Sequence, residues 1–211
     1  MILKFCGFKT KSEVLKLSTL NVNMVGFVYY PKSKRHLEIE QINALAQFVP
    51  DGIDKVVVMV NPTFQLIKKM LKQTHINAIQ LHGEETIAFI KQIRLNFKNI
   101  KIIKALPASQ NIIDEIERYR PYVDLFIIDT LSKQYGGTGH SFDWTILKRI
   151  KQSVPFLIAG GIDANKIKQI ETLHLNHVGY DISSGIETNG MKDKNKMLAV
   201  IQQLKGVQKN V

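Results

Sequence analysis

Eight apolar runs that read as strands alternate with eight segments of helical period, and this alternation constrains the fold more than any other feature. Residues Ile42, Leu45, Ala46 and Val49 show the helical spacing, with apolar side chains at i, i+3, i+4 and i+7. Each crossover helix carries the chain back across the sheet, so strict alternation predicts parallel strands. The strand-like runs are 2–6, 23–29, 55–60, 78–81, 101–104, 123–128, 154–158 and 178–182.

The number of units predicts a closed (β/α)8 barrel. Eight units of roughly 26 residues fit such a barrel near the lower end of its size range. An open, doubly wound sheet is the alternative, but loops of phosphate-binding type after the seventh and eighth runs favour the barrel. No linker rich in Pro, Gly or Ser and no charge block divides the chain. We therefore expect residues 1–211 to form one barrel domain.

Charge and cysteine content limit the functional classes. The formal net charge is +11, from 29 Lys and Arg against 18 Asp and Glu. The basic residues are scattered over expected helix faces rather than clustered with aromatic residues, so we expect no nucleic-acid partner. No apolar run approaches the roughly 18 residues that span a bilayer, and the N-terminal run breaks too early for a secretory signal. With a single cysteine, and hence no internal disulfide, we expect a cytoplasmic protein without a membrane partner.

The sixth apolar run ends in a carboxylate. Asp129 shares its side-chain direction with Leu125 and Ile127, because side chains alternate along a strand. The carboxyl ends of parallel strands carry the chemistry of α/β enzymes, and a glycine-rich loop at 136–139 follows. These features make Asp129 a candidate catalytic residue. On this run alone, a helix or turn cap explains it equally well.

Two loops have the composition of a phosphate site. Gly160 and Gly161 follow the seventh run directly, and Ser183, Ser184 and Gly185 follow the eighth. Glycine allows the backbone to approach a ligand closely, and exposed amides at a loop or helix start bind anions. In (β/α)8 barrels the loops after these two strands often bind phosphate. Each loop alone is typical of a turn, but the pair predicts a phosphorylated ligand.

Three more side chains lie at or near expected strand ends. Cys6 ends the first run; it is either a small buried apolar residue or a thiolate favoured by a cation such as Lys4. His82 ends the fourth run, without a second His or a carboxylate at a metal-ligand spacing, so we expect no metal. Arg35, after the second run, is either a solvated loop residue or a fork that binds a carboxylate or stacks on a flat ring.

Taken together, the motifs resemble the phosphoribosylanthranilate isomerase family of tryptophan biosynthesis. The matching pieces follow the family's order over nearly the whole chain, which makes the resemblance specific although no single piece is. They are KFCG at 4–7, GF at 26–27, SKR at 33–35, QLHG at 80–83, ID at 128–129, GGTG at 136–139, FDW at 142–144, AGG at 159–161, DISSGIE at 181–187 and GMKD at 190–193.

The resemblance implies a (β/α)8 TIM barrel of the ribulose-phosphate-binding type and an isomerase without a cofactor or metal. The implied reaction is the Amadori rearrangement of N-(5-phosphoribosyl)anthranilate to 1-(2-carboxyphenylamino)-1-deoxyribulose 5-phosphate. Asp129 would be the general acid that opens the ribose ring, and Cys6 the general base that removes the C2′ proton. A bound phosphate would favour the protonated form of Asp129, as an acid requires.

The resemblance also implies the binding residues. Arg35 would hold the anthranilate moiety, and Asp181 would orient the ribose hydroxyls. The phosphate would lie on Gly160, Gly161, Ser184 and Gly185, and His82 and Ser183 complete the expected substrate-binding set.

Two other functions remain open from the sequence. One is a different phosphosugar reaction on the same barrel, such as the step that forms indole-glycerol phosphate or an epimerisation, because the phosphate loops bind a handle that these substrates share. The other is a non-catalytic polyanion binder, which would show steeply salt-dependent nucleic-acid binding. The expected partner is a small phosphorylated substrate, and both a monomer and a homodimer are compatible with the sequence.

Overall fold

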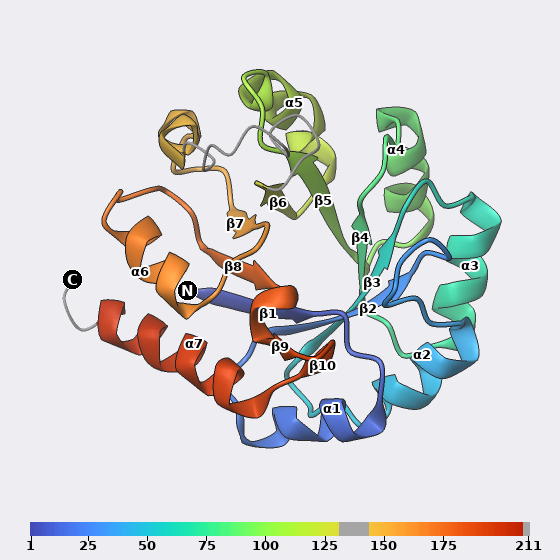
Figure 1. Ribbon diagram of the computed structural model, residues 1–211. Coiled ribbons are helices and arrows are strands. Elements are labelled where there is room, and N and C mark those ends of the chain that lie inside the picture. The colour runs from blue at the N-terminus through green and yellow to red at the C-terminus, as the bar shows by residue number, and fades with distance from the viewer. Residues whose placement is uncertain (131–143, 209–211) are drawn as a thin grey trace.

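A computed structural model describes residues 1–130 and 144–208. Eight parallel strands form a closed barrel in sequence order, with β1 also paired to β8, and helices surround it (Figure 1). Closure confirms the (β/α)8 barrel and rules out the open sheet. The strands are β1 Ile2–Cys6, β2 Met24–Tyr29, β3 Asp54–Met59, β4 Ala78–Leu81, β5 Lys101–Pro107, β6 Leu125–Asp129, β7 Phe156–Ala159 and β8 Gly179–Ile182.

The helices begin where the sequence supplies caps. Thr10 and Glu13 form a capping box at the first helix, and Thr63, Thr86 and Asp163 each accept a backbone N–H at later helix starts. The α-helices are α1 Lys11–Leu15, α2 Ile39–Ala46, α3 Phe64–Gln73, α4 Ile87–Asn96, α5 Ile112–Tyr119, α6 Ala164–Glu171 and α7 Lys194–Gln208. Short 3₁₀ helices are η1 Lys16–Thr19, η2 Arg120–Tyr122, η3 Trp144–Arg149 and η4 Ser184–Ile186.

Alternation along the strands divides the apolar residues between two cores. One set packs between the barrel and the helices, and a smaller set fills the barrel interior. Leu125 and Ile127 belong to the interior set, so Asp129, with the same parity, is directed toward the barrel axis at its rim. The interior set is Met24, Val56, Ala78, Ile103, Ala105, Leu125, Ile127, Leu157 and Ala159.

Two elements differ from expectation. The segment after β6 was expected to be an α-helix but is the 3₁₀ helix η3, although its Leu147 is buried as the stripe predicts. Adjacent β-branched residues, Thr145 and Ile146, weaken α-helix formation in so short a segment. A small hairpin of β9 Glu187–Thr188 and β10 Met191–Lys192 was not anticipated.

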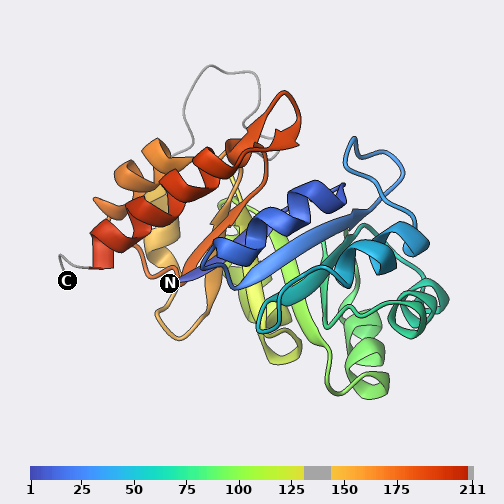
Figure 2. The same ribbon diagram turned by 90° about the horizontal axis from the view of Figure 1, so that it is seen from below.

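The hairpin rises from the barrel end that also carries the loop after β2 (Figure 2). No helix in the described ranges is long and apolar enough to cross a membrane. The glycine-rich loop at 136–139 and residues 142–143 of the matching motifs lie outside the described residues.

Candidate active site

A cavity of about 390 Å³ opens at the carboxyl ends of the barrel strands, a volume typical of small-molecule sites. Because parallel strands all end on this side, residues distant in sequence meet around it. Of the predicted site residues, Cys6, Arg35, His82, Asp129, Gly160, Gly161, Asp181, Ser183 and Ser184 line the cavity. The sequence-based set therefore assembles in one place, with Gly185 as the exception.

Cys6 stands at the end of β1 with its sulfur against β2. Gly26 is its register partner on β2, and a β-carbon there would lie 2.6 Å from Sγ, so glycine makes room for the thiol. Burial raises the pKa of Cys6, because a thiolate loses hydration. Lys4 and Lys192 act in the opposite direction without overcoming burial. The protonated thiol is therefore the favoured form of Cys6 in the free protein. This result argues against the alternative in which Lys4 stabilises a thiolate.

One layer below Cys6, Lys4 forms an ion pair with Asp181. The Nζ–Oδ1 distance is 2.8 Å, and both side chains are buried. Burial opposes the ammonium, but the Asp181 carboxylate and the nearby sulfur outweigh it and raise the pKa of Lys4. Asp181 therefore lines the cavity while already engaged with a cation.

Asp129 and His82 face one another from β6 and the end of β4. His82 Nε2 lies 3.7 Å from Asp129 Oδ2, and both side chains are partly exposed to the cavity. On its other side, His82 Nδ1 lies 3.3 Å from the Gln80 side-chain amide nitrogen. Gln80 therefore contacts one nitrogen of the imidazole while the other nitrogen faces Asp129.

The two predicted phosphate loops lie side by side. Gly160 and Gly161 follow β7, and Ser183 and Ser184 follow β8. Gly185 does not line the cavity; a β-carbon on it would lie 1.8 Å from the Ile162 carbonyl oxygen. Gly185 therefore packs the two loops together, and its contact with phosphate stays a prediction.

Arg35 reaches the cavity from the loop after β2 and lies across Gly7. Its backbone N–H donates to Ser33 Oγ, 3.1 Å away. Its guanidinium makes a two-point ion pair with Glu187, from Nε at 2.8 Å and Nη2 at 2.7 Å. Burial disfavours the Glu187 carboxylate, but Arg35 and Lys192 outweigh it and lower the pKa of Glu187 to about 2.

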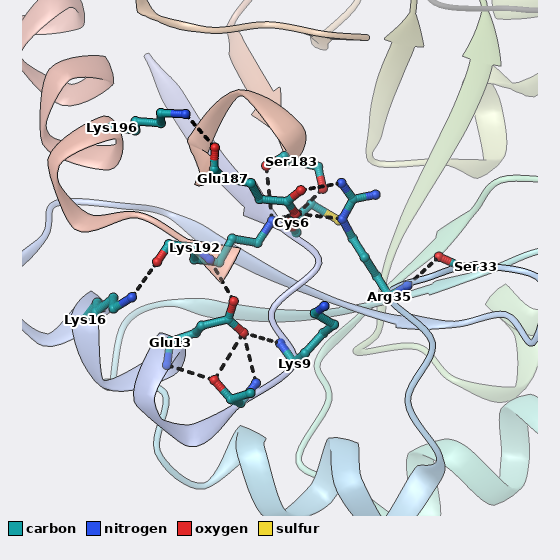
Figure 3. A network of polar contacts seen from close by, with 11 residues as sticks. Cys6, Lys9, Glu13, Lys16, Ser33, Arg35, Ser183, Glu187, Lys192 and Lys196 are labelled. Atoms are coloured by element: carbon teal, nitrogen blue, oxygen red, sulfur yellow. Dashed lines mark hydrogen bonds and ion pairs between the residues drawn. The ribbon is translucent and has the colours of Figure 1, made fainter. Parts of the chain in front are cut away.

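Behind this ion pair is a second layer of charged side chains (Figure 3). Lys192, fully buried on β10, donates from Nζ to Glu187 Oε1 at 2.6 Å and to the Ser183 carbonyl at 3.1 Å. Glu13 of α1 accepts the Lys192 backbone N–H at 2.7 Å. The hairpin is thus hydrogen-bonded to α1 through Glu13, and to the cavity wall through Ser183 and Arg35.

Sequence reasoning assigned no role to Glu187, Lys192 or Gln80, although all three lie in the matching motifs. The available signal was the Asn189-Gly190 pair, which is typical of a two-residue hairpin turn. Recognising that hairpin would have placed Glu187 and Lys192 on adjacent strands. Within residues 1–130 and 144–208, no three His, Cys, Asp or Glu side chains group as metal ligands would.

Comparison with known proteins shows the family to which the chain belongs. Residues 3–203 match the family described as N-(5'phosphoribosyl)anthranilate (PRA) isomerase. The Staphylococcus haemolyticus N-(5'-phosphoribosyl)anthranilate isomerase is 74% identical over 206 residues, covering 98% of this chain and 99% of that protein. The Staphylococcus epidermidis enzyme is 53% identical with the same coverage.

Solved structures support the same assignment. The Thermotoga maritima phosphoribosyl anthranilate isomerase superposes with a TM-score of 0.84 at 29% identity, covering 98% of this chain and 100% of that one. Another phosphoribosyl anthranilate isomerase structure, in complex with reduced 1-(o-carboxyphenylamino)-1-deoxyribulose 5-phosphate, gives 0.83 at 27% identity with the same coverage. The chain belongs to the N-(5'-phosphoribosyl)anthranilate isomerase family.

Proposed function

We propose that this chain is a cytoplasmic enzyme of tryptophan biosynthesis that isomerises N-(5'-phosphoribosyl)anthranilate to the carboxyphenylamino-deoxyribulose phosphate. The observation that carries the proposal is that Cys6 at the end of β1 and Asp129 at the end of β6 line one cavity together with Arg35. Membership of the family supports the reaction, and the geometry supports the residue roles below.

Asp129 is the general acid in this proposal. It donates a proton to the ribose ring oxygen, the C1′–O bond breaks, and the nitrogen lone pair forms a Schiff base at C1′. His82, whose Nε2 lies 3.7 Å from Asp129 Oδ2, contacts the carboxyl group at the cavity wall. The substrate phosphate adds negative charge to the site and favours the protonated acid.

Cys6 is the general base. Its thiolate takes the C2′ proton, and the electron pair moves toward the Schiff-base nitrogen to give an enolamine, which tautomerises to the ketone. Each proton removed is matched by one delivered, so the reaction needs no redox partner. Lys4 and Lys192 supply the positive charge that limits the cost of forming a thiolate in a buried position.

The remaining residues bind the substrate. Arg35 holds the anthranilate carboxylate, and Asp181 orients the ribose hydroxyls. Gly160, Gly161, Ser183, Ser184 and Gly185 hold the phosphate at the loops after β7 and β8. All these residues come from one chain, which folds as a single barrel domain in this proposal, so it applies equally to a monomer and a homodimer.

Growth of a tryptophan auxotroph that lacks this isomerase tests the function. The wild-type gene should restore growth on minimal medium. The purified protein should convert phosphoribosylanthranilate, which is measured as a loss of fluorescence. The Asp129→Asn gene is the matched control and should not restore growth. Absence of rescue and of turnover by a folded wild-type protein would overturn the proposal.

A further inference from the structure

The Arg35–Glu187 ion pair uses one edge of the guanidinium and leaves a second edge available for another carboxylate. A guanidinium has five N–H donors, and Glu187 takes those on Nε and on one side of Nη2. The end-on edge, formed by Nη1 and Nη2, has the right spacing for a second bidentate carboxylate. Arg35 can therefore bridge two carboxylates at once.

The positions of the two residues decide which side faces the ligand. Arg35 is among the described residues that line the cavity, whereas Glu187 is not. Glu187 is largely buried and lies behind the guanidinium, on the hairpin side (Figure 3). It thus engages Arg35 from outside the cavity and does not occupy the ligand position.

A third charge stabilises this arrangement. Lys192 is buried and donates to Glu187 Oε1, so the Glu187 carboxylate lies between two cations, Arg35 and Lys192. Two cations and one anion leave a single positive charge in excess, at Arg35. The cluster of Arg35, Glu187 and Lys192 therefore carries a net charge of +1, and Arg35 is its member that lines the cavity, where it can meet one carboxylate.

The backbone around Arg35 also restricts its position. Gly7 has a φ of +83°, and a β-carbon on it would lie 2.3 Å from Arg35 Cδ and 3.1 Å from Ser183 Oγ. The arginine side chain thus lies directly on the Gly7 backbone. Lys196 holds the hairpin in place by donating to the Glu187 carbonyl oxygen, 2.6 Å away, without touching the ion pair.

We infer that Glu187, supported by Lys192, is a positioning residue that holds Arg35 with its end-on edge toward the cavity, so that the site selects ligands with a carboxylate on the aromatic ring. This inference rests on the proposed function, because it assigns the substrate carboxylate to Arg35. Glu187 itself touches neither the substrate nor the reacting atoms.

The experiment compares two ligands on wild-type protein and on Glu187→Gln. The first is reduced 1-(o-carboxyphenylamino)-1-deoxyribulose 5-phosphate, and the second is the same molecule without the carboxylate. Measured by calorimetry, Glu187→Gln should bind the carboxylated ligand at least about tenfold more weakly than wild type and should bind the ligand without the carboxylate equally well. The affinity is lost only where Arg35 meets the carboxylate. In turnover, KM should rise by a similar factor while kcat stays within about twofold.

Two controls separate positioning from a structural role. Lys196→Met loosens the same hairpin without touching the ion pair and should keep wild-type preference for the carboxylate. In Glu187→Gln the buried charge of Lys192 loses its partner. If this prevents the protein from folding, the double variant Glu187→Gln with Lys192→Met removes both charges and should show the same loss of preference for the carboxylated ligand.

The outcomes distinguish the inference from the function on which it rests. A wild-type protein that prefers the carboxylated ligand, with a folded Glu187 variant that keeps this preference, would overturn the inference alone. A wild-type protein that shows neither turnover nor preference would overturn the proposed function, and the inference with it. A selective loss in the Glu187 variant, with Lys196→Met unaffected, supports the inference.

Discussion

Lys4 and Asp181 form a buried ion pair where the barrel closes: their α-carbons are register partners on β1 and β8, and Nζ lies 2.8 Å from Oδ1. The pair lies one layer below Cys6, so it joins the first and last strands directly beneath the candidate base. Removing one partner leaves a buried charge uncompensated, which costs more than the pair contributes.

We therefore expect Asp181→Leu to lower the free energy of unfolding by about 3–5 kcal/mol. The combination of Lys4→Met with Asp181→Leu should recover most of that loss, because no charge then remains in the barrel. Urea unfolding of the two single variants and the double variant measures both effects. A double variant as unstable as the sum of the singles would show that the charges do not depend on one another.

Gly7→Ala should displace Arg35. The new β-carbon would clash with Arg35 Cδ, and a positive φ at a residue with a side chain costs about 1–3 kcal/mol. We expect a raised KM and a lower unfolding midpoint in urea. Arg35→Ala alone should also raise KM, and adding Gly7→Ala to it should raise KM little further. Additive effects on KM would indicate that Gly7 acts on substrate binding independently of Arg35.

The stability of the protein should depend on pH through Glu187. Its folded pKa of about 2 lies below the ordinary value of 4.5, so the ionised form favours folding. The contribution is complete above about pH 4.5 and is lost as the pH falls toward about 2. Urea unfolding at several pH values should show a smaller decline over this window for Glu187→Gln than for wild type. Parallel declines would contradict the assigned ion pairs.

The raised pKa of Cys6 predicts where its thiolate appears. Because burial disfavours the thiolate, we expect the rate of Cys6 alkylation to increase with pH and to level off only above the ordinary thiol range of about 8.5. Because Cys6 is the only cysteine in the chain, its alkylation by iodoacetamide reports the thiolate directly. An alkylation midpoint below about pH 8 would show that the lysines outweigh burial.

Periodicity predicted the barrel because each strand and most helices carry a local signal. The ends of β1 and β6 could be located in the same way, which identified Cys6 and Asp129 as candidates at one rim. The helix expected after β6 was wrong, since an apolar stripe does not distinguish a short α-helix from the 3₁₀ helix η3.

The pairings around the site could not be read from the sequence. Lys4 meets Asp181 across 177 residues, and Arg35 meets Glu187 across 152, and neither contact has a local pattern. The hairpin strands have two residues each, too short for alternation to show. Consequently the resemblance implied that Arg35 holds the anthranilate moiety, and only the fold reveals that Glu187 pairs with its guanidinium.

The central claim is that Cys6 and Asp129 act together as base and acid in one cavity. Its most direct test is the turnover of phosphoribosylanthranilate by Cys6→Ser and Asp129→Asn, with binding of the reduced product analogue measured on the same samples. We predict that each variant loses at least about a hundredfold in kcat while analogue binding stays near wild type. A kcat near the wild-type value in either variant would contradict the assigned roles.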